Sequence, residues 1–345
     1  MRLLISGGGT GGHLFPALAV ARAFRAESRS GAVLLVGRAG GPEEKLVVDA
    51  GFDLETIVIR GFDRDATWKN LGLPVVLPAA LARGYSIVRR FRPDVVLGVG
   101  GYAMVPSVAA ARVGRVPYVL HEQNFLPGLA TRSLAGGAAA VCITFPGTSV
   151  RARRVELTGL PLRPGFSRRT PAIPPRKLLV TGGSQGARRL NEVVWEALED
   201  LLARFTEVIH VTGRQGAEEG RRRARPRYRP LDFTADMAGL LAEADLVVSR
   251  AGVGTLAEIT AVGLPAILVP GTFGGGHQEA NAAVLVEAGA AVRIGDDDFD
   301  PQRLLAAISS LDDERLRRLA DASASLGRHD AAERVLAVLK EVAAR

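Results

Sequence analysis

Short apolar runs alternate with amphipathic segments along most of the chain. Apolar runs of this length, separated by segments with helical spacing, are typical of strands and helices that follow each other in turn. In the first half the predicted strands are Leu3–Ile5, Ala32–Val36, Leu54–Ile59, Asp94–Gly98, Pro117–His121 and Ala139–Thr144, and the predicted helices include Pro16–Arg25 and Val105–Val113. Such an alternation forms βαβ units, so the pattern predicts an α/β protein with parallel sheets.

A proline-rich break divides the pattern into two halves. Residues 161–176 contain five prolines and are typical of an interdomain linker. Beyond it the predicted strands are Leu178–Thr181, Val208–Val211, Leu246–Ser249 and Ala266–Pro270, and the predicted helices are Arg188–Leu202, Thr255–Val262 and Gln278–Ala288. We therefore expect one domain over residues 1–160, a second over 177–327, and a charged helical C-terminus.

The first strand of each half leads into the same kind of glycine-rich loop. These loops are Gly7–His13 and Gly182–Ala187, and a helical pattern follows each. Glycine lets backbone N–H groups approach a ligand closely, and the N-terminus of the next helix adds a positive dipole. One such loop is a weak sign of phosphate binding. Two, each opening its own α/β half, predict two nucleotide-binding domains that face each other across a cleft.

Composition narrows the classes of protein. A chain of 345 residues with 47% hydrophobic residues is long enough for two cores. The only cysteine is Cys142, which excludes a disulfide framework and a cysteine metal site. No signal sequence and no apolar stretch of about 18 residues is present, so we expect a cytosolic protein that at most sits on a membrane.

The formal charge of +8 comes almost entirely from arginine. It indicates either attraction to anionic partners or a compositional bias toward arginine. No basic run is interleaved with aromatic residues, so nucleic acid is not expected as a partner. The densest run, Arg221–Arg225, is predicted to be a solvated loop, and the acidic triplet 296–298 is predicted to be a turn without a metal.

His13 is the first candidate for chemistry, because a histidine at a helix N-terminus is kept neutral and can act as a general base. It can equally cap the turn, and Thr10 can donate to a phosphate or simply belong to the loop. Glu122 and Asn124 follow a buried strand directly. Glu122 can support His13, bind a hydroxyl group or pair with an arginine.

The second half offers candidates for a nucleotide sugar. Ser184 and Gln185 lie in the second glycine loop, and Glu258 can accept bonds from ribose hydroxyls or merely offset the charge of its helix. Amides near a glycine-rich loop can read sugar hydroxyls, or else cap a helix. The remaining candidates are two possible counter-charges for a diphosphate and two amides: Arg163, Arg250, Gln278 and Asn281.

Two nucleotide motifs are missing. No P-loop consensus occurs in the chain. The segment Gly7–Gly12 imitates a dinucleotide fingerprint, but no acidic residue follows the second strand, which ends in Gly37 and Arg38. This argues against a dehydrogenase.

Taken together, these segments resemble one family over essentially the whole chain. The matching segments are Gly8–His13 with Phe15 and Pro16, Asp94–Tyr102, His121–Asn124, Gly182–Ala187, Ser249–Gly252, and Gln278 with Asn281. The family is MurG, the bacterial N-acetylglucosaminyltransferases of peptidoglycan synthesis. The resemblance implies a GT-B fold: two Rossmann-like parallel-sheet domains, with a last helix, about 328–345, that returns to the N-terminal domain.

The resemblance also implies an activity and roles for residues. The donor would be UDP-GlcNAc and the acceptor lipid I, undecaprenyl-diphospho-MurNAc-pentapeptide, whose 4-hydroxyl is glycosylated with inversion. His13 and Glu122 would be catalytic. Donor-binding residues would be Thr10, Gly11, Gly12, Asn124, Arg163, Ser184, Gln185, Arg250, Glu258, Gln278 and Asn281; acceptor-binding residues would be Gly100, Gly101 and Tyr102. No tightly bound cofactor and no metal are expected.

A lipid-linked acceptor places the chain at the cytoplasmic face of the plasma membrane, as a peripheral protein. The apolar segment Trp68–Pro78, followed by Arg83, Arg89 and Arg90, can be an interfacial patch beside anionic lipid or a buried helix. The donor loop departs from the family, so the sugar contact stays open between His277 and Gln278. The alternative function is another UDP-sugar-dependent GT-B enzyme, a glycolipid synthase or a UDP-GlcNAc 2-epimerase.

Overall fold

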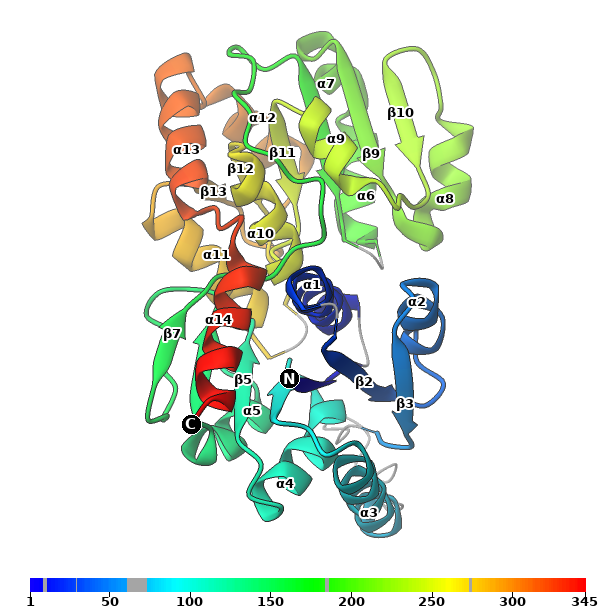
Figure 1. Ribbon diagram of the computed structural model, residues 1–345. Coiled ribbons are helices and arrows are strands. Elements are labelled where there is room, and N and C mark those ends of the chain that lie inside the picture. Colours follow the sequence, from blue (N-terminus) through cyan, green and yellow to red (C-terminus); the bar gives the residue numbers. More distant parts are fainter. Residues whose placement is uncertain (9–10, 29, 61–72, 184–185, 273–274) are drawn as a thin grey trace. The chain divides into compact units, whose positions relative to one another are not determined.

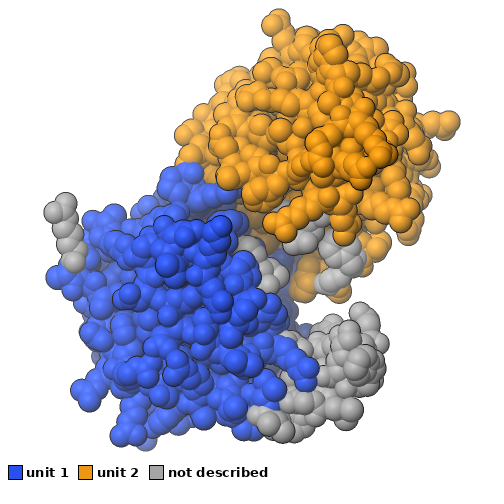
Figure 2. Space-filling model, turned by 90° about the vertical axis from the view of Figure 1, so that its right-hand side faces the viewer, with its two compact units in different colours: residues 1–164, 330–345 blue, residues 165–329 orange. Residues whose placement is uncertain are grey.

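The computed structural model describes residues 1–8, 11–28, 30–60, 73–183, 186–272 and 275–345, without the side chains of residues 11 and 73–75. It divides into two compact units (Figures 1 and 2). Unit 1 comprises residues 1–164 together with 330–345, and unit 2 comprises residues 165–329.

Unit 1 is built on a parallel sheet of seven strands in its described part, in the order β3-β2-β1-β4-β5-β6-β7. The strands are β1 (Arg2–Ser6), β2 (Ala32–Arg38), β3 (Asp53–Ile57), β4 (Val95–Gly98), β5 (Tyr118–Glu122), β6 (Ala140–Ile143) and β7 (Val155–Leu157). The helices are α1 (Gly11–Glu27), α2 (Glu43–Asp49), α3 (Leu73–Phe91), α4 (Val105–Val113), α5 (Leu129–Leu134) and α14 (Ala331–Ala343).

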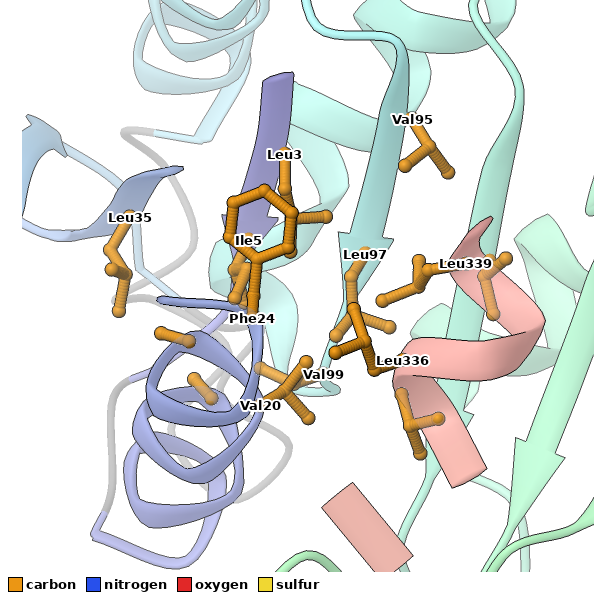
Figure 3. Packing of buried hydrophobic residues seen from close by; sticks show 14 of the residues in the cluster. Leu3, Ile5, Val20, Phe24, Leu35, Val95, Leu97, Val99, Leu336 and Leu339 are labelled. Carbon is orange, nitrogen blue, oxygen red and sulfur yellow. The ribbon is translucent and has the colours of Figure 1, made fainter. Parts of the chain in front are cut away.

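The strands of unit 1 are apolar on both faces because helices cover both faces of the sheet. In β1, Leu3 and Ile5 point into one core, which α1 and α14 cover, while Leu4 points into the other, which α3, α4 and α5 cover. Figure 3 shows the first core, where the side chains of α1 and of α14 pack against the sheet from the same side. The C-terminal helix therefore belongs to unit 1, although the chain reaches it only after unit 2.

Unit 2 repeats this topology with six strands in its described part, in the order β10-β9-β8-β11-β12-β13, again all parallel. The strands are β8 (Lys177–Thr181), β9 (Glu207–Val211), β10 (Tyr228–Leu231), β11 (Leu246–Ser249), β12 (Ala266–Leu268) and β13 (Ala291–Arg293). The helices are α6 (Arg188–Glu196), α7 (Leu198–Arg204), α8 (Gly213–Arg222), α9 (Met237–Glu243), α10 (Val253–Val262), α11 (His277–Glu287), α12 (Pro301–Ser309) and α13 (Asp313–Leu326).

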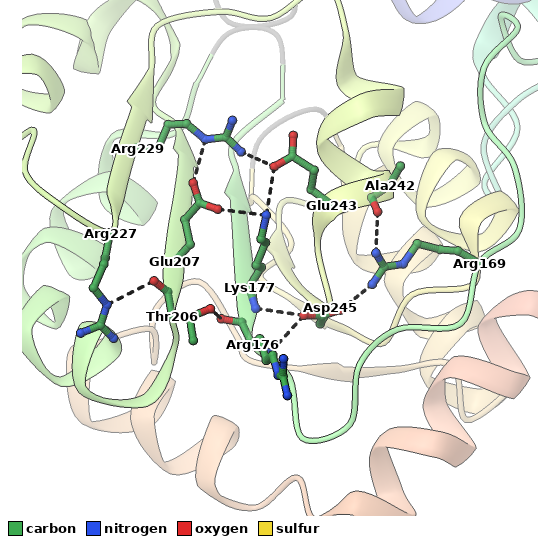
Figure 4. Close-up of polar contacts among 10 residues, drawn as sticks. All are labelled: Arg169, Arg176, Lys177, Thr206, Glu207, Arg227, Arg229, Ala242, Glu243 and Asp245. Atoms are coloured by element: carbon green, nitrogen blue, oxygen red, sulfur yellow. Dashed lines mark hydrogen bonds and ion pairs between the residues drawn. The ribbon is translucent and has the colours of Figure 1, made fainter.

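The entry of the chain into unit 2 is fixed by one buried carboxylate, Asp245 (Figure 4). Its oxygens accept hydrogen bonds from the backbone N–H groups of Ala172, Arg176 and Lys177, at 2.8 to 3.0 Å. The guanidinium of Arg169 forms an ion pair with the same carboxylate. The segment that was predicted to be a linker is thus bound to unit 2 just before β8 begins.

Several elements differ from the sequence-based expectations. The predicted helix 188–202 is two helices, α6 and α7, with a break at Ala197. Arg221 and Arg222 are in the last turn of α8, so the predicted solvated loop starts only after them. Elements that the sequence did not predict include α2, α5, α8, α9 and the short strands β7, β10 and β13.

Removing the carboxylate of Asp245 should destabilise unit 2 strongly. The change Asp245→Ala leaves a guanidinium and three N–H groups without their acceptor, and we expect a loss of about 3–5 kcal/mol of unfolding free energy. Glu243→Ala is the matched control, because this half-exposed carboxylate pairs with Lys177 and Arg229 and should lose less than about 1 kcal/mol. Denaturant unfolding measures both, and equal losses would contradict this role of Asp245.

Candidate active site

The strand order fixes where a ligand can bind in each unit. In a doubly wound parallel sheet, ligands bind beyond the carboxyl ends of the strands, at the point where the strand order reverses. In unit 1 this point lies between β1 and β4, and in unit 2 between β8 and β11. The two glycine loops follow β1 and β8, so both begin at these points.

His13 lies in the first turn of α1, against the loop that follows β4. A Cβ atom on Gly100 would lie 2.6 Å from Cδ2 of the imidazole, and one on Gly101 would lie 3.6 Å from its Nδ1. Both glycines have positive φ, 97° and 71°. The loop therefore needs glycine at both positions, for its backbone conformation and for the space that the imidazole occupies.

Burial lowers the pKa of His13 from 6.5 to about 4. The imidazole is therefore neutral at pH 7 and has the protonation state of a proton acceptor. The sequence predicted the same neutral form but attributed it to the helix dipole, whereas desolvation is the dominant cause here.

His121, at the carboxyl end of β5, is a second buried neutral imidazole. Its Nε2 donates to the carbonyl oxygen of Gly159 at 2.9 Å, and burial lowers its pKa to about 4. The charge of His13 lowers the same pKa, which shows that the two rings are close enough to interact. Next to it, the side-chain amide of Gln123 donates to the carbonyl oxygen of Val99 at 3.0 Å and ties the end of β5 to the end of β4.

Glu122 makes backbone contacts that the sequence did not predict. One of its oxygens accepts the backbone N–H of Asn124 at 3.0 Å, and the other accepts that of Gly128 at 3.1 Å. The carboxylate is 4% exposed, and its two oxygens close the turn that carries Asn124. These contacts give Glu122 a positioning role toward Asn124, and its catalytic role stays a prediction.

The sequence analysis missed Glu43, the first residue of α2. This carboxylate is 1% exposed, and a Cβ atom on Gly8, Gly37 or Gly41 would overlap its side chain. The glycines around it are the signal that could have identified it. Nearby, at the end of β2, Arg38 donates to the hydroxyl oxygen of Tyr102 at 3.2 Å and so fixes a predicted acceptor-binding residue.

In unit 2, Gln278 and Arg250 bind the loops at the ends of β11, β12 and β13 together. The side-chain oxygen of Gln278 accepts the backbone N–H groups of Ala251 and Gly271, at 3.2 and 2.9 Å. Its amide nitrogen is the part of the side chain that can still donate to a ligand. Arg250 donates to Asp296 at 2.6 Å and is 7% exposed. Arg250 therefore forms an internal ion pair with Asp296, and its contact with the donor stays a prediction.

The remaining residues predicted for the site lie at the following positions in the fold. Glu258 is half-buried on α10, and Asn281 is buried on α11. The guanidinium of Arg163 lies over the ring of Phe15, 5.1 Å from its centroid, which places it beside α1. Gly11 begins α1 and Gly12 is exposed. Thr10, Ser184, Gln185 and residues 61–72 lie outside the described residues.

A buried polar network supports the second glycine loop from below. The two ring nitrogens of His210, on β9, lie 3.0 Å from the oxygens of Tyr228 and Asn191. Asn191, on α6, donates to the carbonyl oxygen of Thr212 at 2.8 Å. A Cβ atom on Gly186 would lie 2.7 Å from that same oxygen. The network thus holds the last part of the glycine loop and the start of α6 against the end of β9.

No group of three or more histidine, cysteine, aspartate or glutamate side chains suited to a metal ion occurs in the part of the chain that the structure describes. Within the same residues, no helix is long and apolar enough to cross a membrane.

Comparison with known proteins gives consistent matches over nearly the whole chain. Residues 3–143 match the model of the glycosyltransferase family 28 N-terminal domain, and residues 177–335 match that of the C-terminal domain. A relative from Moorella thermoacetica, named UDP-N-acetylglucosamine--N-acetylmuramyl-(pentapeptide) pyrophosphoryl-undecaprenol N-acetylglucosamine transferase, is 41% identical, covering 98% of both chains. A relative of the same name from Syntrophotalea carbinolica is 40% identical, covering 99% of both.

Among solved structures, MurG from Acinetobacter baumannii is similar, with a TM-score of 0.83 and 28% identity over 99% of both chains. Two Rossmann-like units of the GT-B type and these matches define a glycosyltransferase of family 28. Within that family, the chain belongs to the MurG N-acetylglucosaminyltransferases.

The His210 network makes a prediction about acid stability. Burial lowers the pKa of His210 from 6.5 to about 3, so below pH 6.5 the unfolded chain binds a proton that the folded chain does not. The stability that the neutral imidazole contributes is present above pH 6.5 and is lost as the pH falls. Wild type should therefore lose about 2 kcal/mol between pH 6.5 and about 5 from this group alone.

The change His210→Gln removes this proton-linked part, so the stability difference between wild type and variant should shrink as the pH falls. Denaturant unfolding followed by tryptophan fluorescence measures it, because Trp195 donates to the same Tyr228 hydroxyl. The exposed His329 offers the control His329→Gln, which should follow the wild-type curve. A difference independent of pH would contradict a buried neutral His210.

Proposed function

We propose that the protein transfers GlcNAc from UDP-GlcNAc to the 4-hydroxyl of MurNAc in undecaprenyl-diphospho-MurNAc-pentapeptide, with inversion at the anomeric carbon. The names of the relatives support both substrates. The observation that carries the chemistry is the neutral imidazole of His13, seated against Gly100 and Gly101 at the switch point of unit 1. An acceptor hydroxyl needs a proton acceptor there, and His13 has the required protonation state.

The reaction proceeds by one displacement. His13 accepts the proton of the acceptor hydroxyl, and the freed oxygen forms a bond to the anomeric carbon of GlcNAc. The bond from that carbon to the diphosphate oxygen breaks on the opposite face, and UDP leaves with the electron pair. The N–H groups of the second glycine loop and the N-terminus of α6 stabilise the charge on the leaving diphosphate.

The remaining contacts in this proposal rest on the family resemblance. In unit 2, Glu258 holds the ribose, the amide nitrogen of Gln278 and Asn281 face the GlcNAc, and Ser184 with Gln185 bind the diphosphate. In unit 1, Thr10, Gly11, Gly12 and Asn124 lie near the donor sugar, and Arg163 supplies charge for the phosphates. Gly100, Gly101 and Tyr102 form the acceptor side. No tightly bound cofactor or metal enters this scheme.

Because the acceptor carries a polyprenyl chain, we also propose peripheral binding to the cytoplasmic face of the plasma membrane. The predicted patch on α3 is less basic than its sequence suggests, because Arg83 and Arg90 both pair with Glu55. Leu77 and Tyr85 of the same helix are 43% and 46% exposed and can contact lipid. Two arginines on one carboxylate still leave one positive charge, and Arg89 of the same helix adds a second.

Release of UDP tests the proposed activity. With UDP-GlcNAc in detergent, we expect release only when a lipid I analogue is added, since the acceptor hydroxyl is the nucleophile. Release should persist in excess chelator, because the scheme contains no metal. Acceptor-independent release would point to an epimerase or a hydrolase and contradict the transferase.

Changing His13 tests the base. His13→Ala should lower kcat about 100- to 10,000-fold and leave the Kd for UDP unchanged, because the imidazole acts on the acceptor. Gly100→Ala should also lower kcat, because its Cβ displaces the ring. Gly40→Ala is the matched control, with a positive φ of 68° but open space around the added atom.

The pH profile gives an independent check on His13. For the free enzyme, kcat/KM should fall on the acid side near pH 4, where His13 becomes protonated. Unchanged turnover in His13→Ala would remove the residue from the mechanism.

A further inference from the structure

The acidic turn that follows β13 has no part in the proposed reaction. It consists of Asp296, Asp297 and Asp298, and it lies at the carboxyl edge of the sheet of unit 2, because β13 ends at Arg293. Asp297 and Asp298 are exposed, whereas the side chain of Asp296 is only 15% exposed. One carboxylate of the turn is therefore directed into the unit, and its partner indicates what it does there.

Asp296 forms an ion pair with Arg250, the residue that follows β11. Nη1 of Arg250 donates to Oδ1 of Asp296 at 2.6 Å, and the two side chains are 8% and 15% exposed. The same Nη1 donates to the carbonyl oxygen of Val269, which follows β12, at 3.1 Å. A pair this far out of water keeps its geometry, because either charge would be costly to leave alone. The guanidinium thus joins the ends of three neighbouring strands, β11, β12 and β13.

Gln278 bridges two of the same strand ends. Its Oε1 accepts the N–H of Ala251, the residue after Arg250, at 3.2 Å. It also accepts the N–H of Gly271, two residues after Val269, at 2.9 Å. Both donors therefore belong to segments that the guanidinium of Arg250 holds at a fixed separation. If that separation changes, Oε1 cannot keep both bonds, and the amide moves.

The backbone of the acidic turn is anchored independently of Asp296. Nη2 of Arg189, on α6, donates to the carbonyl oxygen of Asp297 at 2.9 Å, and its Nε donates to that of Phe299 at 3.2 Å. Phe299 is 1% exposed and belongs to the core of unit 2. Asp296 therefore projects from a fixed turn and can hold Arg250 in place rather than follow it.

We propose that Asp296 is a positioning residue for recognition of the donor sugar, acting through Arg250 on the side-chain amide of Gln278. The inference rests on the proposed function, in which that amide faces GlcNAc. Because two backbone N–H groups occupy Oε1, the amide offers the sugar only the two hydrogens of its nitrogen. Such a donor binds an oxygen atom of the sugar, and its direction has to be accurate, since a hydrogen bond weakens steeply when it is misaligned.

Binding of UDP-GlcNAc and of UDP to the full chain separates the sugar from the nucleotide. The Kd of each ligand is measured by calorimetry, without acceptor. The test variant is Asp296→Asn, which removes the charge and keeps the size of the side chain. The matched control is Asp297→Asn, which makes the same change at an exposed carboxylate of the same turn. Two further variants, Gln278→Ala and the double change, show whether Asp296 acts through Gln278.

We expect Asp296→Asn to raise the Kd for UDP-GlcNAc about tenfold, which is the effect of one lost hydrogen bond. The Kd for UDP should stay within about twofold of wild type, because UDP has no sugar for the amide to bind. The control should keep both constants within about twofold, as a surface change does. Gln278→Ala should also lose about tenfold, and adding Asp296→Asn to it should cost less than about twofold more, because coupled residues are not additive.

Three results would overturn the proposal. Equal weakening of UDP and UDP-GlcNAc in Asp296→Asn would mean that the turn merely supports the fold of unit 2. Tighter binding of UDP would mean that Asp296 withholds Arg250 from the diphosphate. Additive losses in the double variant would mean that Asp296 does not act through Gln278.

The binding experiment contains no acceptor, so it stands apart from the proposed transfer. Failure of wild type to bind UDP-GlcNAc would contradict the proposed function itself. Binding with the expected pattern of losses, but no release of UDP with a lipid I analogue, would contradict the proposed transfer and support the role of Asp296.

Discussion

The parallel direction of the described strands in both sheets is the constraint on which the rest of this molecule depends. It gathers the carboxyl ends of the strands at one edge, so residues far apart in sequence meet there. In unit 1 this edge brings His13 from the first helix against Gly100 after β4, and His121 of β5 near His13. In unit 2 it brings Gln278 to the ends of β11 and β12. The direction of the strands therefore decides where each site lies, and the side chains decide only what it can bind.

Desolvation lowers the pKa of three histidines, but their positions separate their roles. His121 and His210 lie within strands, where each ring has a fixed hydrogen-bond partner and joins two segments. His13 stands at the start of a helix, where its ring faces a loop of two glycines. A pKa near 4 makes it a weak base in the free protein. A bound diphosphate would raise that pKa, because negative charge favours the imidazolium, so substrate binding itself would improve the base.

The sequence predicted the central strands and the place of the site, and it failed where contacts between distant segments decide. β11 and α4 match their predicted ranges, because a buried strand or helix has an apolar pattern of its own. The edge strands β7, β10 and β13 have three or four residues and partial exposure, which leaves no such pattern. Glycine loops after strands located the candidate site. The partners of Glu122 and Arg250 could not be predicted, because they depend on turn geometry and on Asp296.

The structure divides the many arginines of the chain into those that pair with a carboxylate and those that do not. Some of the described arginines are neutralised by carboxylates, on a helix surface such as Arg222 with Glu218 or inside a unit as Arg250 with Asp296. Paired charges of this kind contribute little to attraction at a distance. Arg112, Arg115 and Arg153, near the amino ends of β5 and β6, are among the arginines with no carboxylate partner in the described part of the chain. The attraction that a net charge of +8 exerts on anions therefore comes mainly from the arginines that no carboxylate neutralises.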